Sequence, residues 1–359
     1  MINEYWLLLT KIKNITRYIM KTKIFYSTLI CSSILLLWFI FSPLMNANPL
    51  DSGEAKIELN FERITPSRLI EKKINLQQLF DEYPAVSPYI VEFCYGLNLK
   101  SDSSLSASLL EFSQQSYILK TEIEINKRFA DLTGHKQKIK SSISRLKAQF
   151  DTIRIPEEIV FANSNFTYNA TCYNESILVG LERYIGGNHP IIIESLNPSE
   201  FPEWIRNGMN EKFMDRDILS AWISTKLFKE TTGYHIEEMI RWGKIHLTTE
   251  MCLRLDNEDI PISDVLRWSE QQFEWALSNE GKFWKYLMDE NLLFDSNEKN
   301  RAYLLNNGPY TIGLPEESPD RMGQFLGYRI VLNYIQNQNL ELRDLLDTDY
   351  KIILKSYNP

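Results

Sequence analysis

The chain has 359 residues, enough for one large or two ordinary domains, and its 44% hydrophobic content is ordinary for a globular protein with a sizeable core. The formal net charge is −8, but the first 23 residues carry five basic groups and one acidic group, or +4, which leaves −8 − 4 = −12 for the remainder. Because so acidic a body repels phosphate backbones and shows no basic stripe, we expect no nucleic acid among its partners.

The N-terminal region contains an uncharged run of 18 residues, Ile24–Phe41, which follows Lys21 and Lys23. A helix of this length spans about 27 Å, just enough for the core of a bilayer. The positive charge ahead of it predicts a cytoplasmic N-terminus and translocation of everything after Pro43. Cleavage near Ala47 is the alternative, but the run is longer than a usual signal peptide, which favours a retained anchor.

This run divides the chain into four parts. Residues 1–23 form a basic segment, of which 1–19 can be an over-called start because Met20 heads a more typical signal. Residues 24–41 form the transmembrane anchor or signal, 42–55 a polar linker, and 56–359 one envelope domain.

The four cysteines show neither CxxC pairing nor the spacing of metal ligands. Cys31 lies in the apolar run, and lipidation there would need a small residue before it, whereas Ile30 precedes it. The other three allow at most one disulfide and one free thiol. They are Cys94, Cys172 and Cys252.

Beyond the linker, the patterns predict an α+β fold that is mostly α-helical with a small β-sheet. The expected elements are a strand at Lys56–Arg63, helices within Leu76–Tyr95 broken near Pro84 and Pro88, two helices within Ser104–Phe150 separated at Gly134, strands at Ile159–Phe161 and Ile177–Leu181, and a helix at Asp215–Lys229. Three sequons, at Asn165, Asn169 and Asn174, are interpreted as polar turns between strands, and His189 as a loop-capping residue.

The stretch Tyr234–Phe294 is the richest in aromatic residues, and its apolar spacing predicts three helices. The first begins near Ile236, the second near Val265, and the third after Ser278 as its N-cap. A tryptophan stripe at helical spacing usually belongs to the core, because each ring buries a large apolar area. We therefore expect the following side chains to be core: Trp242, Trp268, Trp275 and Trp284.

A further helix is expected after this stretch, with Ser318 as its N-cap and Pro319 as its first residue. Gly323 and Gly327 lie four residues apart in it. This spacing predicts that a neighbouring helix approaches closely at these glycines.

No catalytic or cofactor-binding residues can be assigned from motifs, because the chain lacks a GxSxG elbow and both common phosphate-binding loops. The one alternative is a metal site from two helical pairs, His235 with Glu238 and His246 with Glu250. Neither pair makes the HExxH signature, which needs two histidines four residues apart. We therefore expect no metal and no cofactor.

Several motifs, taken in order, resemble the GldB family of gliding-motility lipoproteins from Bacteroidetes bacteria. They are FERITPSRL and FDEYP near the start, then GLERYIGGNHP (Gly180–Pro190), MIRWGKIHL (Met239–Leu247), WALSNEGKFWKYLMDENLLF (Trp275–Phe294), GPYT followed by ESPDRMGQFLGYRIVLNYI (Gly308–Ile335), and a terminal LKSYNP. Together they cover most of the chain after the anchor.

The resemblance implies a cell-envelope protein that is anchored in a membrane with its body on the periplasmic side and associates with other envelope proteins of the gliding or secretion machinery. It implies no enzymatic activity. The family is distantly similar to predicted zinc-dependent proteases that carry HExxH on a central helix, so a zincin-like fold with a degenerate site is expected. Family members are typically lipoproteins, whereas this chain lacks the lipidation signal at Cys31.

Two other functions remain open. A membrane-tethered zinc-dependent metallopeptidase would use His235, Glu238, His246 and Glu250. A cell-surface binding module would hold a small ligand between aromatic helices, although the sequence offers no convergent set of polar residues for it.

Overall fold

The computed structural model describes residues 55–358, except residues 74, 85, 100–101, 232 and 255–259. The expected basic segment, the anchor Ile24–Phe41, Cys31 and nearly all of the linker lie outside the described residues. Among the helices that are described, none is long and apolar enough to cross a bilayer. The residues described, 55–358, are called the body of the protein below.

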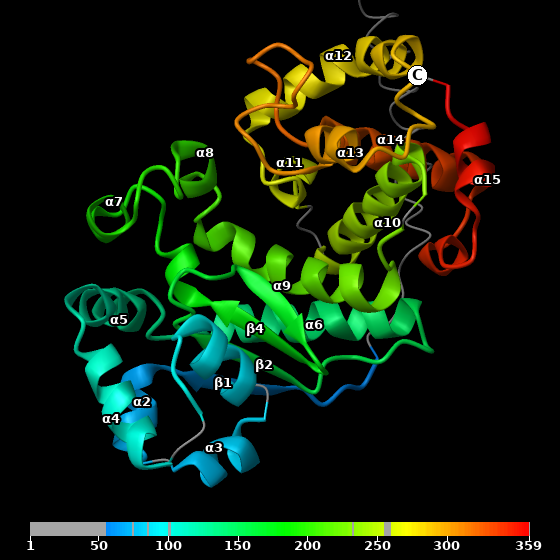
Figure 1. Ribbon diagram of the computed structural model, residues 1–359. Helices are drawn as coiled ribbons and strands as arrows, with labels where there is room; N and C mark the ends of the chain where they lie inside the picture. Colours follow the sequence, from blue (N-terminus) through cyan, green and yellow to red (C-terminus); the bar gives the residue numbers. More distant parts are fainter. Residues whose placement is uncertain are drawn as a thin grey trace, which may run out of the picture. The chain divides into compact units, whose positions relative to one another are not determined.

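A mixed four-stranded sheet lies in the N-terminal half of this body (Figure 1). Its strands are β1 (Asn60–Ile64), β2 (Glu158–Ala162), β3 (Ala170–Tyr173) and β4 (Ser176–Gly180), in the order β1-β2-β4-β3. β1, β2 and β4 are parallel, with Val160 opposite Leu178, and β3 is antiparallel to β4. The small sheet and its three expected strands are confirmed. The polar turn expected at Asn174 is confirmed as well, because this residue joins β3 to β4 with φ +53°.

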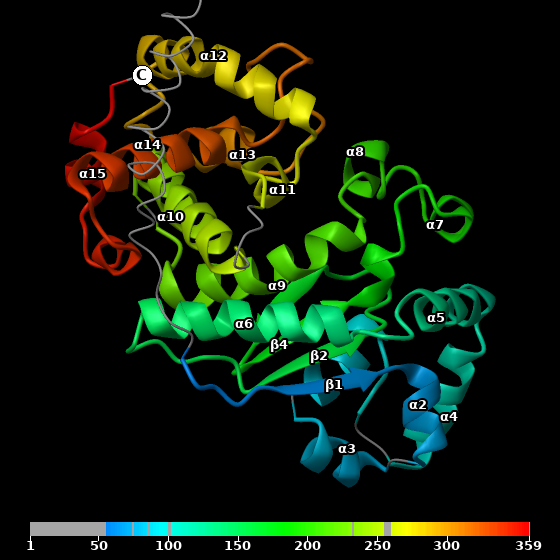
Figure 2. The ribbon, with the colours of Figure 1, turned by 180° about the vertical axis from the view of Figure 1, so that it is seen from behind.

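Both faces of the sheet are covered, as expected for parallel strands. Val160 and Leu178 belong to a core cluster with the N-terminal helices. Since side chains alternate along a strand, Ile159 and Ile177 face the other side, where helices α6 and α9 lie (Figure 2). All four side chains are at most 1% exposed.

The N-terminal helices follow the expected pattern with two corrections. They are α2 (Pro66–Glu71), α3 (Leu76–Glu82), the π-helical η1 (Ser87–Cys94), α4 (Asp102–Ser113), α5 (Ser116–Arg128) and α6 (Thr133–Gln149). The break near Pro84 and Pro88 is confirmed. Residues 102–149 form three helices rather than the expected two. The predicted break at Gly134 is wrong, because the break lies at residues 129–132 and Gly134 belongs to the first turn of α6. Just before this helix, the Asp131 carboxylate accepts a hydrogen bond from the Thr133 backbone N–H at 2.8 Å.

The C-terminal half is helical. Its longer helices are α9 (Met214–Trp222) with the π-helical η4 (Ile223–Leu227), α10 (His235–Leu253), α12 (Glu270–Asp289), α13 (Glu298–Leu305) and α14 (Met322–Gln338). Short elements connect them: η2 (Leu181–Tyr184), α7 (Pro190–Ser195), α8 (Glu203–Arg206), η3 (Glu211–Phe213), α11 (Ile262–Val265), η5 (Leu342–Leu345) and α15 (Tyr350–Lys355).

Helices α10 and α14 cross at glycines. A Cβ atom placed on Gly327 would lie 1.6 Å from the Met239 carbonyl oxygen, and one on Gly243 would lie 2.1 Å from the Gly327 carbonyl oxygen. Only hydrogen atoms fit between the two backbones at this crossing. The close helix approach predicted for Gly327 is therefore confirmed.

Two predicted helix starts are wrong. Ser278 lies in the middle of α12, which begins earlier because Ser269 and Gln272 form a reciprocal capping box. Ser318 and Pro319 precede α14 without capping it, because the N-cap position is taken by Arg321.

The four tryptophans expected in the core divide into two groups. Trp268 is buried, as predicted, whereas the other three are only half-buried. For them the interpretation as plain core is wrong, and one of the three, Trp242, lines a cleft.

Candidate functional site

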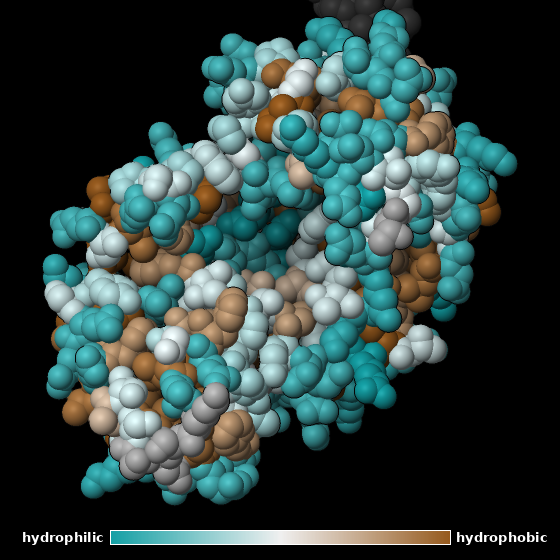
Figure 3. Space-filling view, viewed as in Figure 1, coloured by the Kyte–Doolittle hydropathy of each residue, from teal (hydrophilic) through white to brown (hydrophobic). Residues whose placement is uncertain are grey.

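A polar cleft opens between the sheet region and the C-terminal helices (Figure 3). It consists of a cavity of about 490 Å³ and an adjoining cavity of about 320 Å³, which share wall residues. The shared residues are Asn169, Arg267, Asn307 and Arg321. A third cavity of about 440 Å³ shares Ser224 and Trp242 with the second and extends the cleft along α10.

Four arginines from four separate segments line the first two cavities. They are Arg183 in η2, Arg216 in α9, Arg267 just after α11, and Arg321 at the start of α14. Burial, together with repulsion from Arg267 and Arg321, lowers the pKa of Arg216 to about 10, although Asp217 opposes the shift. Arg216 therefore stays charged at neutral pH.

Asp217 is the central acceptor of this cluster. Its carboxylate accepts a hydrogen bond from the Tyr184 hydroxyl at 2.9 Å and one from Arg216 Nη1 at 3.0 Å. Arg267 Nη1 approaches the same carboxylate at 3.6 Å, and the Asn169 side-chain amide donates to it at 3.4 Å. One carboxylate thus joins η2, α9 and the segment after α11.

A second carboxylate, Asp320, orients Arg321. Arg321 donates to both oxygens of Asp320, from Nε at 2.9 Å and from Nη2 at 3.0 Å. Asp320 also accepts hydrogen bonds from Trp268 Nε1 at 2.9 Å and from the Gly308 backbone N–H at 3.2 Å. The aspartate is therefore fixed by its neighbours and holds the guanidinium beside the cleft.

Two of the arginines have strained backbones. Arg267 has φ +58° and Arg321 has φ +57°, in the left-handed region that side-chain-bearing residues avoid. Such conformations persist only where the surrounding structure imposes them, and they concentrate at functional sites.

The part of the cleft formed by the first two cavities is more cationic than the rest of the protein. Four arginines and two aspartates give 4 − 2 = +2 along the inner walls, whereas the whole chain carries −8. One further acid, Glu203, lines the first cavity but is exposed at its rim. Low-dielectric walls concentrate the field of such a cluster, so the cleft attracts anions despite the acidic body.

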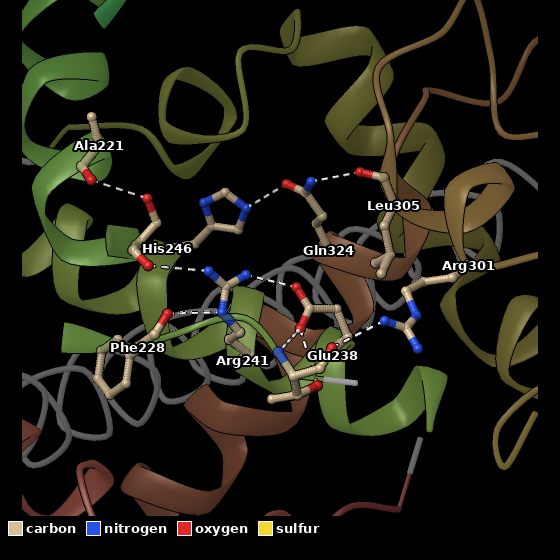
Figure 4. A network of polar contacts seen from close by, with 10 residues as sticks. Ala221, Phe228, Glu238, Arg241, His246, Arg301, Leu305 and Gln324 are labelled. Carbon is tan, nitrogen blue, oxygen red and sulfur yellow. Dashed lines mark hydrogen bonds and ion pairs between the residues drawn. The ribbon is translucent and has the colours of Figure 1, made fainter. Parts of the chain in front are cut away.

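His246 lies behind the cleft wall, in the network that Figure 4 shows. Its Nε2 lies 2.8 Å from Gln324 Oε1, and the Gln324 amide donates onward to the Leu305 carbonyl at 2.6 Å. Because the Gln324 amide nitrogen is used on Leu305, its oxygen faces the imidazole and Nε2 carries the proton. The indole of Trp242 stacks on the ring, with the centroids 5.5 Å apart.

The other candidate metal ligands of α10 form hydrogen bonds with other protein groups. His235 Nε2 lies 2.9 Å from the Asn297 carbonyl oxygen. Glu238 accepts from Arg241 at 2.6 Å and from the Thr231 backbone N–H at 3.2 Å.

Glu250 completes the set of four. It accepts from the Tyr328 hydroxyl at 2.8 Å and from Arg254 at 2.9 Å. His246 and Glu250 do share a helix face, as their spacing predicts, but this face packs on α14. The structure brings no three of the four residues together, and no cluster of His, Cys, Asp or Glu within the described ranges has the arrangement of a metal site.

The three described cysteines form no disulfide and are not reactive thiols. Cys94, Cys172 and Cys252 are free thiols, and burial raises the pKa of Cys94 and of Cys252 to about 12. These thiols stay protonated and unreactive at neutral pH. His189 caps a helix as predicted, because its Nδ1 accepts from the Ile191 backbone N–H at the start of α7.

Sequence reasoning missed the arginine cluster. The sequence could have pointed to two members of the cluster. Arg183 and Arg321 each directly follow an acidic residue within the motifs that carry the family resemblance. Arg216 also follows an acidic residue, Asp215, but neither Arg216 nor Arg267 lies in those motifs. Their role depends on segments that meet only in the folded protein.

His246 gives the fold a dependence on pH. Burial, and after it the charge of Arg216, lowers the pKa of His246 well below its usual 6.5. The unfolded chain therefore takes up a proton that the folded chain excludes, so stability is full above pH 6.5 and falls as the pH drops towards the folded pKa. Between pH 6.5 and 5.5, the wild type should lose about 1 kcal/mol more of its free energy of unfolding than the His246→Gln variant, measured by urea titration.

His135 provides the control for this experiment. Hydrogen bonds and charges from Asp215 and Glu211 outweigh burial and raise the pKa of His135 above 6.5, so its contribution is instead lost as the pH rises. His135→Gln should therefore leave the acid-side loss in place. Equal acid sensitivity in the wild type and His246→Gln would show that His246 is not the group responsible.

The comparisons with known proteins give one family. No curated protein and no solved structure matches the chain. The family model described as gliding motility protein GldB matches residues 46–359, which is nearly all of the chain after the apolar N-terminal run. On this match, the chain belongs to the GldB family of gliding motility proteins.

Proposed function

We propose that this protein is a membrane-anchored component of the gliding-motility and secretion machinery that acts by binding other molecules rather than by catalysis. Family membership supports a role in gliding motility and a location in the cell envelope. The basic segment followed by the apolar run Ile24–Phe41 supports the anchor and a periplasmic body. The proposed partners are other envelope proteins.

The observation that carries the binding role is the state of the central helix α10. Its His and Glu side chains, where a zincin-like protease would hold its metal, are each hydrogen-bonded to protein groups. Beside this helix lies the large polar cleft, lined by Trp242, Gln324 and the arginines. This is the convergent polar set that the sequence did not reveal.

Deletion and complementation in the host bacterium test this role. The deletion strain should lose colony spreading, and the wild-type gene should restore it. His246→Gln should restore spreading equally, because the imidazole is neutral and glutamine is a poor zinc ligand. Normal spreading and secretion in the deletion strain would refute the proposed role.

The same strains separate binding from catalysis. If His246→Gln folds with an unchanged melting temperature but fails to restore spreading, and the wild type contains stoichiometric zinc by elemental analysis, the metallopeptidase is the correct reading.

Fractionation tests the anchor. The full chain should remain in the membrane fraction after a high-pH carbonate wash, and mass analysis of its N-terminus should show residues 24–41 retained. Recovery of the intact chain from the cytosol would contradict the anchor, and a diacylated Cys31 would replace it with a lipid.

A further inference from the structure

We propose that the arginine-lined cleft binds a ligand through an oxyanion, a carboxylate or phosphate group, with Arg183 and Arg321 as its direct contacts. The inference rests on the proposed binding role and adds the chemistry of the ligand. It follows from which donors in the cleft are already used, from the backbone strain, and from the remaining lining.

The four arginines differ in how many of their N–H groups form hydrogen bonds with other parts of the protein. Arg216 donates to the Val265 carbonyl at 2.6 Å as well as to Asp217, and Arg267 donates to the Gly208 carbonyl at 2.5 Å as well as approaching Asp217. These two hold segments of the fold together. They supply positive charge to the cleft but have structural roles of their own.

Arg183 and Arg321 are less committed. A guanidinium has five N–H groups. Arg321 uses two of them, both on the adjacent Asp320, and Arg183 uses one, its Nε, on the Asn169 side chain at 2.9 Å. Within the part of the chain that the structure describes, neither has another hydrogen-bond acceptor. Their remaining donors are available to an acceptor that enters the cleft.

Both of these arginines are held in place. The face of Phe201 packs on the Arg183 guanidinium, 5.3 Å from the ring centroid. Arg321 is fixed by Asp320 and by its left-handed backbone, which the fold maintains at an energetic cost. Planar guanidinium groups that are fixed in advance match the paired oxygens of a carboxylate or a phosphate.

The rest of the lining suits an organic ligand rather than a bare ion. The Asn307 side-chain amide can donate and accept hydrogen bonds, the Gln272 amide nitrogen can donate, and Trp204 offers an aromatic face. A cavity of about 490 Å³ has the size of an ordinary small-molecule site. The oxyanion would therefore be one end of a larger polar molecule.

Calorimetric titration of the purified full-length protein in detergent tests the proposal. The probes are inorganic phosphate and succinate, each at fixed ionic strength made up with sodium chloride. At least one should bind, and which one binds distinguishes the phosphate source from the carboxylate source. Arg321→Gln should raise the dissociation constant by about tenfold or more, as expected for a lost charged hydrogen bond. Arg183→Gln should do the same.

Arg329→Gln is the matched control. Arg329 lies on the same helix as Arg321, but it pairs with Glu280 at 2.8 Å and lines a different cavity. This variant should bind as the wild type does. The proposal is overturned if neither probe binds, if the Arg321 and Arg183 variants bind normally, or if Arg329→Gln loses binding to the same degree. Loss of binding with an unchanged melting temperature separates a direct contact from unfolding.

The titration tests the oxyanion site, whereas the motility of the deletion strain tests the proposed function, so the two can fail separately. Absence of oxyanion binding alongside a clear motility defect of the deletion strain removes this inference and leaves the proposed function standing. Oxyanion binding alongside normal motility of the deletion strain removes the proposed function and leaves the oxyanion site standing.

Discussion

Gly327→Ala should lower the free energy of unfolding by about 3 kcal/mol, at the upper end of the usual cost of overpacking. The added methyl group would lie 1.6 Å from the Met239 carbonyl oxygen and 2.4 Å from its carbon, and both are backbone atoms that cannot rotate away. Helices α10 and α14 would have to separate, which would disturb the hydrogen bond between His246 and Gln324. Urea unfolding followed by circular dichroism measures the change.

Gly281→Ala is the matched control, in the middle of the exposed helix α12. A Cβ atom there meets nothing within 4 Å. Because alanine favours helix over glycine, this variant should gain about 0.5 to 1 kcal/mol. Gly323→Ala should fall between the two, since its Cβ atom would lie 2.8 Å from the flexible Leu305 side chain and 3.0 Å from the Leu304 carbonyl oxygen, farther than the 1.6 Å at Gly327. If Gly327→Ala is as stable as the wild type, α10 and α14 do not cross as described.

Features that depend on local patterns could be predicted from the sequence. Short β-prone runs located β2 and β4, helical spacing located α9 and α10, and two glycines four residues apart predicted that a neighbouring helix approaches α14 closely. The predicted boundaries failed where a polar side chain decided them. Ser269 rather than Ser278 caps the start of α12, and α6 begins one residue before Gly134, where the Asp131 carboxylate binds the Thr133 backbone N–H.

The metal hypothesis shows the limit of reading spacing alone. His246 and Glu250 share a face, as four residues on a helix must, but that face meets Gln324 and Tyr328, which lie four apart on α14. Between His235 and His246 the helix rises about 16 Å, too far for one ion to bridge. Which partners a helix face meets is a tertiary property, and the sequence did not contain it in readable form.

The arginine cluster was out of reach for the same reason. Consecutive members are separated by 33, 51 and 54 positions in the sequence, and each lies in a different segment of the fold. No spacing rule connects such residues. The tryptophans were misjudged similarly, because Trp242 lies on a face of α10 that borders a cleft rather than another helix.

Asp217→Asn should destabilise the protein by about 3 to 5 kcal/mol, the range expected when a buried ion pair loses one partner. Asp217 is only 6% exposed, accepts hydrogen bonds from Tyr184 and Arg216, and forms an ion pair with Arg267. An amide keeps the shape of the side chain but carries no charge. Both guanidinium groups would remain in the cleft wall without their counter-ion.

An exposed aspartate provides the control for the loss of one charge. Asp289 pairs with Lys285 at 2.7 Å, and its side chain is 57% exposed. Because exposed pairs contribute little, Asp289→Asn should change the free energy of unfolding by about 0.5 kcal/mol or less. Equal effects of the two substitutions would mean that the Asp217 cluster is solvated and unimportant for the fold.

The same substitution should act in opposite directions on folding and on binding. Losing Asp217 raises the net charge of the inner cleft from +2 to +3, so an oxyanion entering it gains attraction. Phosphate or succinate, whichever binds the wild type, should bind Asp217→Asn more tightly and recover more stability in it than in the wild type at the same ionic strength. Such a rescue should disappear when Arg321→Gln is added, because the variant would then lack the donor that holds the anion. If sodium chloride at equal ionic strength restores the fold equally well, the recovery is general screening and the cleft holds no specific anion.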